Sequence, residues 1–402
     1  MPPACRCYLL SIAVCGPLAG TAPAHAAPFR PADDAQVLEQ LPTRLLSSEQ
    51  QSLRQLRDQL RATPGNAAVA AELAGNYYRL AQRTGDPRYV GYAQSVLAPW
   101  PAGSDAPNAI RTVRALVAQF LHDFDGALND LDAVLLAEPG DVGARSYRAI
   151  IHLVKADYDR ARADCVELER HIKGLVASAC LPTVAAVNGQ AKAALTRLTS
   201  LLSRYPAAPN NEKLWVFNRL AEIAQRLGRP QEADAYYHRA LGLGITDQYL
   251  LATYAEFLLD QNRPAEVVEL LKAQVQNDVL LLRLALAEKA LDLPGVAAHR
   301  GMLADRYAAS RQRGDKLHLA DEALFALHFA GQPASALKLA QENWGLMQRE
   351  PSDARILIEA ALAARDAAGA KAALDWLRTT GHEDVTIRQL ATRLEALDGG
   401  KP

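Results

Sequence analysis

The side chains that could carry chemistry in this 402-residue chain show no catalytic spacing. Eight histidines follow Ala26, and no two of them stand four residues apart around a glutamate, as a zinc-protease helix requires. The sequence also contains no G-x-S-x-G nucleophile elbow and no phosphate-binding loop. We therefore predict that the protein is not an enzyme and that it uses no cofactor and no metal.

An acidic turn after His122 offers carboxylates at a spacing that could suggest a calcium site. An EF-hand loop needs oxygen ligands at alternating positions and a glutamate at its twelfth position. Counted from Asp123, the fifth position is Ala127 and the twelfth is Val134, so the pattern fails. We interpret Asp123 and Asp125 as residues of a turn and a helix N-terminus, where negative charge is favourable.

The start of the chain has the pattern of a secretory signal. Arg6 precedes an apolar run, and Ala24-His25-Ala26 resembles an A-x-A cleavage site. The run is shorter than the roughly 20 residues that a membrane-spanning helix needs. We expect cleavage after Ala26, an exported periplasmic protein and no transmembrane segment in the mature chain. The alternative is a lipoprotein anchored through Cys15, although the residue before that cysteine is not small.

Removal of the signal would leave two cysteines, Cys165 and Cys180. They have no C-x-x-C partner, which argues against a zinc or redox motif. The turn 171–174 lies midway between them, so they face each other if two antiparallel helices flank it. An even cysteine count in an exported chain predicts a disulfide here. The alternative is two buried free thiols, which pack as small apolar residues.

The elements that position these side chains are short amphipathic helices in pairs. From Leu214 to Leu227, apolar residues recur at three-and-four spacing, as on one buried helical face. Gly228 can end this helix in a left-handed conformation, and Pro230 suits the first turn of the next. Small Ala233 allows the two helices to approach closely.

This helix pair resembles the tetratricopeptide (TPR) repeat. The residues that match the family pattern, in order, are Phe217, Leu220, Ala221, Gly228, Ala233, Tyr237 and Ala240. The aromatic residue of the family's first helix is replaced by Ala224, and its closing proline by Ile245. The small residue that opens the second helix recurs along the chain at Ala93, Ala127, Ala161, Ala194, Ala233, Val267, Ala297, Ala336 and Ala372.

The spacings between these positions run from 30 to 39 residues, and three of them equal 34. The TPR period is about 34. The resemblance implies an all-α fold, a right-handed α-solenoid of about nine TPR-like helix-turn-helix repeats. We divide the chain into a signal peptide (1–26), an N-terminal helical cap (27–66), the solenoid (67–382), and a C-terminal capping helix with its tail (383–402).

The charge balance and the family resemblance together predict the kind of partner. A net charge of −1, from 44 basic and 45 acidic residues, argues against a nucleic-acid-binding surface. In TPR proteins the first helix of each repeat lines a concave face. The resemblance therefore implies a partner-binding groove at Asn218, Glu222, Gln225 and Glu256. Of the family's dicarboxylate-clamp residues only Asn218 matches, so we do not predict capture of a terminal carboxylate.

The sequence thus predicts a non-catalytic exported scaffold that binds protein partners, whose identity it does not specify, through this concave surface. An alternative is a permanent structural subunit of an envelope assembly, for polysaccharide export or outer-membrane biogenesis. Glycan binding and enzymatic activity are further alternatives. The most aromatic stretch, Tyr77 to Trp100, is interpreted as helix packing, or alternatively as a platform for a peptide or glycan. The sequence does not predict the oligomeric state.

Overall fold

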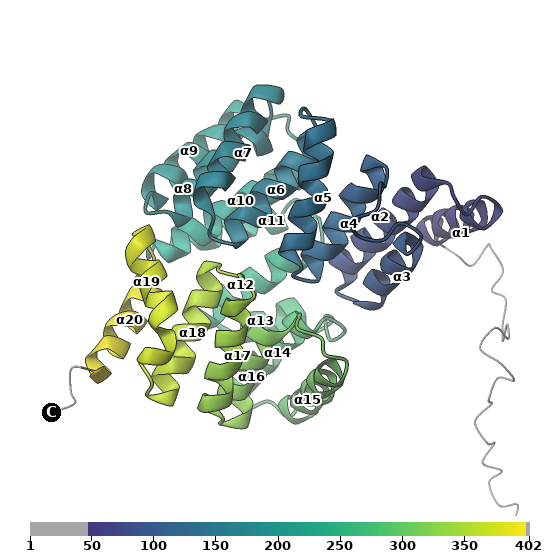
Figure 1. The fold of residues 1–402 in the computed structure, drawn as a ribbon. Helices are drawn as coiled ribbons and strands as arrows, with labels where there is room; N and C mark the ends of the chain where they lie inside the picture. Colours follow the sequence, from purple (N-terminus) through teal and green to yellow (C-terminus); the bar gives the residue numbers. More distant parts are fainter. Residues whose placement is uncertain (1–46, 399–402) are drawn as a thin grey trace, which may run out of the picture. The chain divides into compact units, whose positions relative to one another are not determined.

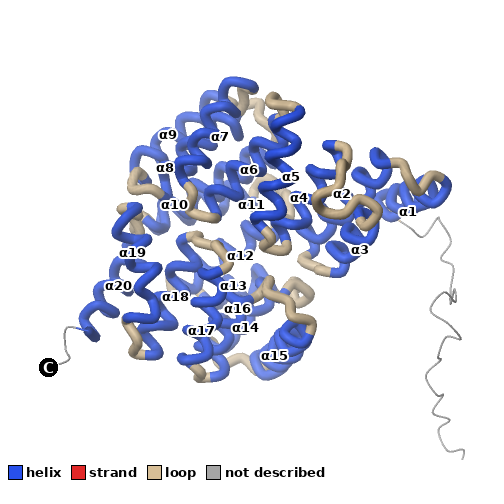
Figure 2. The backbone as a smooth tube through the Cα atoms, viewed as in Figure 1, coloured by secondary structure: helices blue, strands red, loops and turns tan. Residues whose placement is uncertain are grey.

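The computed structural model describes residues 47–398, and the chain from Ser52 onward belongs to one compact unit, Ser52–Pro402 (Figure 1). Every regular element in the described range is helical (Figure 2). No helix within it is both long and apolar enough to cross a membrane. The predicted signal peptide, Cys15, the first half of the predicted cap (27–46) and the last four residues lie outside the described residues.

The described helices form nine consecutive pairs, between a first helix α1 (Ser48–Ala62) and a last helix α20 (Val385–Asp398). The pairs are α2 (Ala67–Thr84) with α3 (Arg88–Leu97), α4 (Asn108–Phe120) with α5 (Phe124–Ala137), α6 (Val142–Val154) with α7 (Tyr158–His171), α8 (Leu175–Val187) with α9 (Ala191–Arg204), α10 (Asn210–Arg226) with α11 (Pro230–Leu241), α12 (Gln248–Asp260) with α13 (Pro264–Leu271), α14 (Asp278–Ala290) with α15 (Val296–Gln312), α16 (Leu319–Phe325, continued by the π turn Ala326–Ala330) with α17 (Pro333–Gly345), and α18 (Pro351–Ala364) with the turn Ala368–Ala370 and α19 (Lys371–Thr380). This confirms the predicted all-α fold of about nine TPR-like repeats.

The small residue near the start of each second helix is buried in seven of the nine pairs. The prediction was wrong at Ala297 and Ala372, which are exposed. In the ninth pair the next residue, Ala373, is buried instead, so the sequence register was one residue out. In the seventh pair α15 is long, and it packs through the larger side chains of Leu303 and Tyr307 further along the helix.

Short polar side chains begin many of these helices and satisfy their first amide groups. Asp123 caps α5 by accepting a 3.0 Å hydrogen bond from the Gly126 N–H, and Asp247 caps α12 through Leu250 in the same way. Asp125 lies in the first turn of α5. The interpretation of the acidic turn as a helix start is therefore confirmed. Within residues 47–398, no group of three or more His, Cys, Asp or Glu side chains is placed to hold a metal ion.

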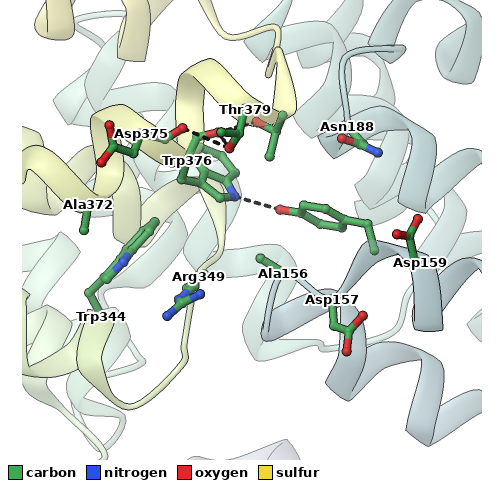
Figure 3. Close-up of a pocket in the computed structure, with 12 residues that line it drawn as sticks. Ala156, Asp157, Asp159, Asn188, Trp344, Arg349, Ala372, Asp375, Trp376 and Thr379 are labelled. Carbon is green, nitrogen blue, oxygen red and sulfur yellow. Dashed lines mark hydrogen bonds between the residues drawn. The ribbon is translucent and has the colours of Figure 1, made fainter.

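The last repeats pack against the third and fourth. The Arg349 N–H donates to the Val154 carbonyl at 2.9 Å. Trp376 Nε1 donates to the Tyr158 hydroxyl at 2.8 Å, the bond drawn as a dashed line from Trp376 in Figure 3. His382 Nδ1 lies 3.0 Å from the Val187 carbonyl, to which it must donate because a carbonyl oxygen only accepts. We call these three bonds the closing contacts.

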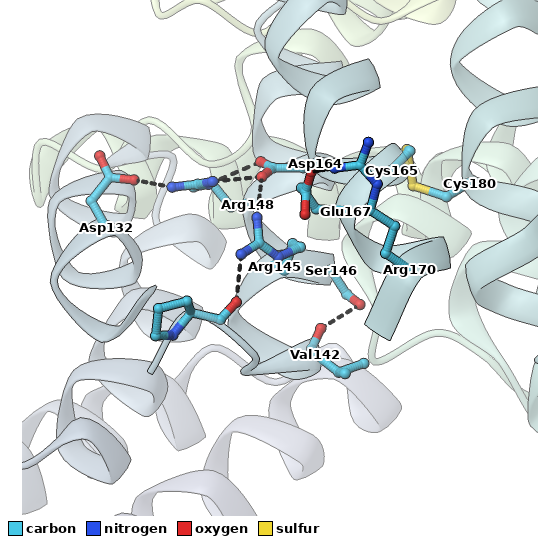
Figure 4. Close-up of polar contacts among 11 residues, drawn as sticks. Asp132, Val142, Arg145, Ser146, Arg148, Asp164, Cys165, Glu167, Arg170 and Cys180 are labelled. Atoms are coloured by element: carbon cyan, nitrogen blue, oxygen red, sulfur yellow. Dashed lines mark hydrogen bonds and ion pairs between the residues drawn. A yellow bond between two sulfur atoms is a disulfide. The ribbon is translucent and has the colours of Figure 1, made fainter. Parts of the chain in front are cut away.

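Covalent and ionic bonds tie the third pair to its neighbours (Figure 4). The Cys165 and Cys180 sulfurs are bonded, with 5.4 Å between the Cα atoms, and this links α7 to α8. Asp164, the residue before Cys165 on α7, accepts from Arg148 of α6 at 2.9 Å. The same arginine contacts Asp132 of α5 at 2.7 Å. Three successive helices are thus held together by one guanidinium beside the disulfide.

Candidate functional site

A cavity of about 380 Å³, here called the central cavity, lies among the first helices of successive repeats. Its wall comes mainly from α8, α10, α12, α14, α16 and α18, with the α17–α18 loop. Residues three, four and seven apart share one face of a helix. On α12 the lining residues Tyr249, Ala252, Thr253 and Glu256 have this spacing. This helix therefore presents one face, with the polar residues Tyr249, Thr253 and Glu256, to the cavity.

Three of the four predicted groove residues line this cavity: Glu222, Gln225 and Glu256. Asn218 does not, because its side chain is only 2% exposed and is packed within the repeat. The assignment of Asn218 to the groove was therefore wrong. Asn218 stands four and seven residues before Glu222 and Gln225, on the same face of α10, but neighbouring side chains cover it here.

An exposed aromatic side chain stands at the cavity wall beside the first predicted carboxylate. Tyr249 is 46% exposed, and its hydroxyl donates to Glu222 Oε1 at 2.5 Å. The same Glu222 oxygen accepts from Arg219 Nη2 at 2.9 Å, and the Arg219 guanidinium carbon lies 4.8 Å from the centre of the Tyr249 ring. A cation over a ring face is attracted by it. The tyrosine is therefore held in place before any partner binds.

Ion pairs connect the first helices around the cavity. Arg283 of α14 bonds Glu256 of α12, with Nε 3.0 Å from Oε1, and it also pairs with Asp321 of α16. Arg355 of α18 reaches back to Asp260 at the end of α12, with two bonds of 2.7 Å. Bidentate arginine–carboxylate pairs fix both partners in orientation. These bonds hold the faces of α12, α14, α16 and α18 in register.

Three further carboxyl groups face the cavity without an arginine partner, in the described part of the chain. Burial raises the pKa of Glu350, Asp353 and Asp384. Asp353 accepts hydrogen bonds from Asn343 Nδ2 at 2.8 Å and from the Glu350 N–H at 2.9 Å. Asp384 accepts from the Ile387 N–H at 2.9 Å, at the start of α20. Amide donors, not cations, satisfy these last two groups.

A second cavity of about 550 Å³ opens beside the closing contacts, between the start of α7 and α19 (Figure 3). Trp344, Trp376 and Tyr158 line it together with acidic side chains such as Asp157 and Asp375. Both tryptophans are buried, so little of either ring reaches the opening. Nothing in the sequence pairs residue 158 with residue 376, because no repeat period relates them.

The aromatic stretch from Tyr77 to Trp100 is a packing cluster. Tyr77 and Tyr78 are buried, and Tyr89 and Trp100 pack partly buried against the same core. Only Tyr92 of the aromatic residues in this stretch is largely exposed, at 51%. Its ring lies 5.5 Å from that of Tyr77, centre to centre. The stretch therefore does not present an open aromatic platform.

Comparison with known proteins gives similarity only among solved structures. No family model matches the chain, and no curated protein matches it. A tetratricopeptide repeat protein from Parabacteroides merdae is 18% identical over 63% of this chain and 90% of that one, with a TM-score of 0.40. Yeast Tom70 is 10% identical, over 87% and 85%, with a TM-score of 0.42. Human IFIT1 is 12% identical, over 87% and 86%, with a TM-score of 0.39. These likenesses are distant, and the TPR-like description rests on the helix pairs themselves.

Proposed function

We propose that the protein is a non-catalytic scaffold that binds a segment of a partner protein in the central cavity. The observation that carries this proposal is Tyr249, a large aromatic side chain left 46% exposed on the wall of the central cavity. Exposed tyrosines with fixed positions are common anchors of protein interfaces. Glu256, on the same face of α12 as Tyr249, and Gln225 of α10 provide polar contacts on the same wall.

The wall is suited to binding because its side chains are already ordered. The pairs Arg219–Glu222, Arg283–Glu256 and Arg355–Asp260 restrict long side chains that would otherwise lose freedom when a partner binds. Ordering a flexible side chain on binding costs about 0.5–1.5 kcal/mol. A wall ordered in advance avoids that cost for each paired residue.

We propose further that the protein acts after export, in the periplasm. The apolar run and the A-x-A-like site of the first 26 residues support this, with cleavage after Ala26. The Cys165–Cys180 disulfide is compatible with an oxidising compartment. In this proposal the mature chain consists of the cap (27–66), the solenoid (67–382) and the closing segment (383–402).

The test is crosslinked affinity capture of the mature chain from the native cell envelope, compared between two tyrosine variants. Tyr249→Ala removes the anchor at the cavity, and Tyr92→Ala removes a similarly exposed tyrosine on α3, away from it. We expect a stoichiometric partner with the wild-type chain and with Tyr92→Ala, and a loss of at least tenfold with Tyr249→Ala. Equal retention by both variants would refute binding in the central cavity.

A further inference from the structure

Arginines inside this solenoid are normally paired with a carboxylate. Six that join neighbouring helices have such a partner: Arg114, Arg145, Arg148, Arg283, Arg306 and Arg355. Two arginines on the wall of the central cavity differ, Arg226 and Arg349. Among residues 47–398, no carboxylate oxygen lies within 4.0 Å of either guanidinium. A buried N–H donor that is left without an acceptor is costly.

Both guanidinium groups also keep a buried N–H without a hydrogen-bond partner. Arg226 Nε donates to the Glu222 carbonyl at 3.2 Å, but its Nη1 is buried and has no acceptor. Arg349 Nη2 contacts the Met347 sulfur at 3.0 Å, a weak acceptor, and its Nε is buried without one. Each of these positively charged side chains therefore lacks a hydrogen-bond acceptor for one buried N–H group.

Tyr158 brings a third donor to the same place. It lines the central cavity together with both arginines, and with Arg349 it also lines the second cavity (Figure 3). Its oxygen already accepts from Trp376 Nε1, which leaves its own hydrogen free to donate. Burial raises the pKa of Tyr158 to about 12. The charges of Arg226 and Arg349 oppose that rise and the charge of Glu350 adds to it, so all three groups act on this hydroxyl. The hydroxyl therefore remains a proton donor at neutral pH.

The carboxyl groups on the cavity wall do not supply the missing acceptors. Asp353 and Asp384 accept from amide groups at the starts of α18 and α20. Glu350 has a raised pKa because it is buried, and the nearby charges of Arg219 and Arg226 oppose that rise. At the Tyr158 end of the cavity, the Arg226 and Arg349 guanidinium groups therefore keep N–H donors that no carboxyl group accepts.

We propose that Arg226, Arg349 and the Tyr158 hydroxyl form a seat for an oxyanion, a carboxylate or phosphate group carried by the ligand of the central cavity. This inference rests on the proposed function, since the anion is part of the bound segment. Guanidinium groups match the paired oxygens of both anions. Binding would give each orphaned N–H an acceptor and would place a negative charge against two guanidinium groups that have no carboxylate within 4.0 Å.

The test is calorimetric titration of the full mature chain with inorganic phosphate, succinate, and succinamide as the uncharged analogue. We expect saturable binding of phosphate or succinate and none of succinamide. Hydrogen bonds to charged groups contribute enough to predict a loss of roughly 10- to 100-fold for Arg226→Gln and for Arg349→Gln. Arg300→Gln, an exposed arginine of α15 that lines neither cavity, should bind like the wild type.

A second measurement separates a ligand site from a structural one. Without added anion, both glutamine variants should melt at or above the wild-type temperature, because each removes an unpaired charge. A structural arginine would instead lower it. If a glutamine variant does not fold, arginine Nε–H resonances of the wild type, assigned with Arg226→Lys and Arg349→Lys, provide the same test. We expect phosphate or succinate to shift both signals, and no shift with either anion would overturn the proposal.

The outcomes distinguish this inference from the proposed function. Failure of both anions to bind, or full binding by both glutamine variants, refutes the anion seat, even if capture of a partner still depends on Tyr249. Anion binding that depends on Arg226 and Arg349, with capture unchanged in Tyr249→Ala, refutes the proposed use of the cavity wall instead. Preference for phosphate indicates a phosphorylated segment, and preference for succinate indicates an acidic one.

Discussion

His382 makes the packing of the last repeat against the fourth sensitive to pH. Its ring is fully buried, Nδ1 donates to the Val187 carbonyl at 3.0 Å, and Nε2 has no partner. Burial, assisted by the positive charge of Arg226, lowers the pKa of His382 to about 3. The side chain is therefore neutral in the folded protein across the physiological range.

The sign and size of the effect follow from linkage. An unfolded histidine has a pKa of about 6.5. Below that pH the unfolded chain takes up a proton that the folded chain does not bind until about pH 3, so acid favours unfolding. Each pH unit in this window corresponds to about 1.36 kcal/mol. Between pH 7 and pH 4, His382 alone should remove about 3 kcal/mol from the free energy of unfolding.

The assay compares urea unfolding of the wild type and His382→Asn at pH 4 to pH 7. Asparagine can still donate to the Val187 carbonyl, and it does not titrate. The raised pKa values of Glu350 and Asp353 act in the opposite direction, since protonating these groups favours the folded state. They are present in both proteins, so the difference between the two curves isolates His382.

We expect the free energy of unfolding to fall by about 3 kcal/mol more in the wild type than in His382→Asn over this range. Trp376 fluorescence is a suitable local probe, because its ring lies 4.9 Å from that of His382, centre to centre. His171→Asn, at an exposed histidine, should keep the wild-type pH dependence. Parallel curves for the wild type and His382→Asn would refute the reasoning.

Three further predictions concern other parts of the chain. Replacing both Cys165 and Cys180 with serine should lower the free energy of unfolding by about 3 kcal/mol, from the 15-residue loop; non-reducing peptide mapping of exported protein that found two free thiols would contradict the bond. Arg283→Met should cost about 3–5 kcal/mol in thermal unfolding, since its side chain is 8% exposed and its removal leaves the largely buried Asp321 carboxylate without its cation. Arg378→Met, at a 62% exposed side chain, should cost at most about 1 kcal/mol, and equal costs would contradict the argument. N-terminal sequencing of the exported protein should begin at Ala27, and an intact Met1 would refute the signal peptide.

The repeat architecture was predictable from the sequence because each helix pair is determined by residues close together in the chain. Gly228, Pro230 and Ala233 identify the turn of one helix pair, and the small residue of the second helix recurs along the chain at a spacing near 34. The register failed at Ala297, where α15 packs through larger residues further along, and at Ala372, which is one residue from the buried position. Neither departure alters the periodicity that identifies the fold.

The cavity was predictable only in part. Glu222 and Glu256 were found from family positions, and stepping back by helical spacing from Glu256 would also have found Tyr249. Arg349 could not be found this way, because it lies in a loop whose place depends on how distant repeats pack. Likewise, the bond between Tyr158 and Trp376 joins residues 218 positions apart. Periodicity identifies faces of helices, whereas the meeting of distant repeats depends on the accumulated geometry of every pair between them.

The α17–α18 loop connects the closing contacts to the central cavity. The backbone of Arg349 bonds to Val154, and its side chain lines the cavity. A ligand that contacts this side chain therefore binds the arrangement in which the loop is docked. By linkage, such a ligand stabilises the closing contacts to the extent that it prefers the docked loop over the undocked one. Protonation of His382 favours the opposite state. Acid and ligand should therefore act against each other on the same contact, although they bind at different residues.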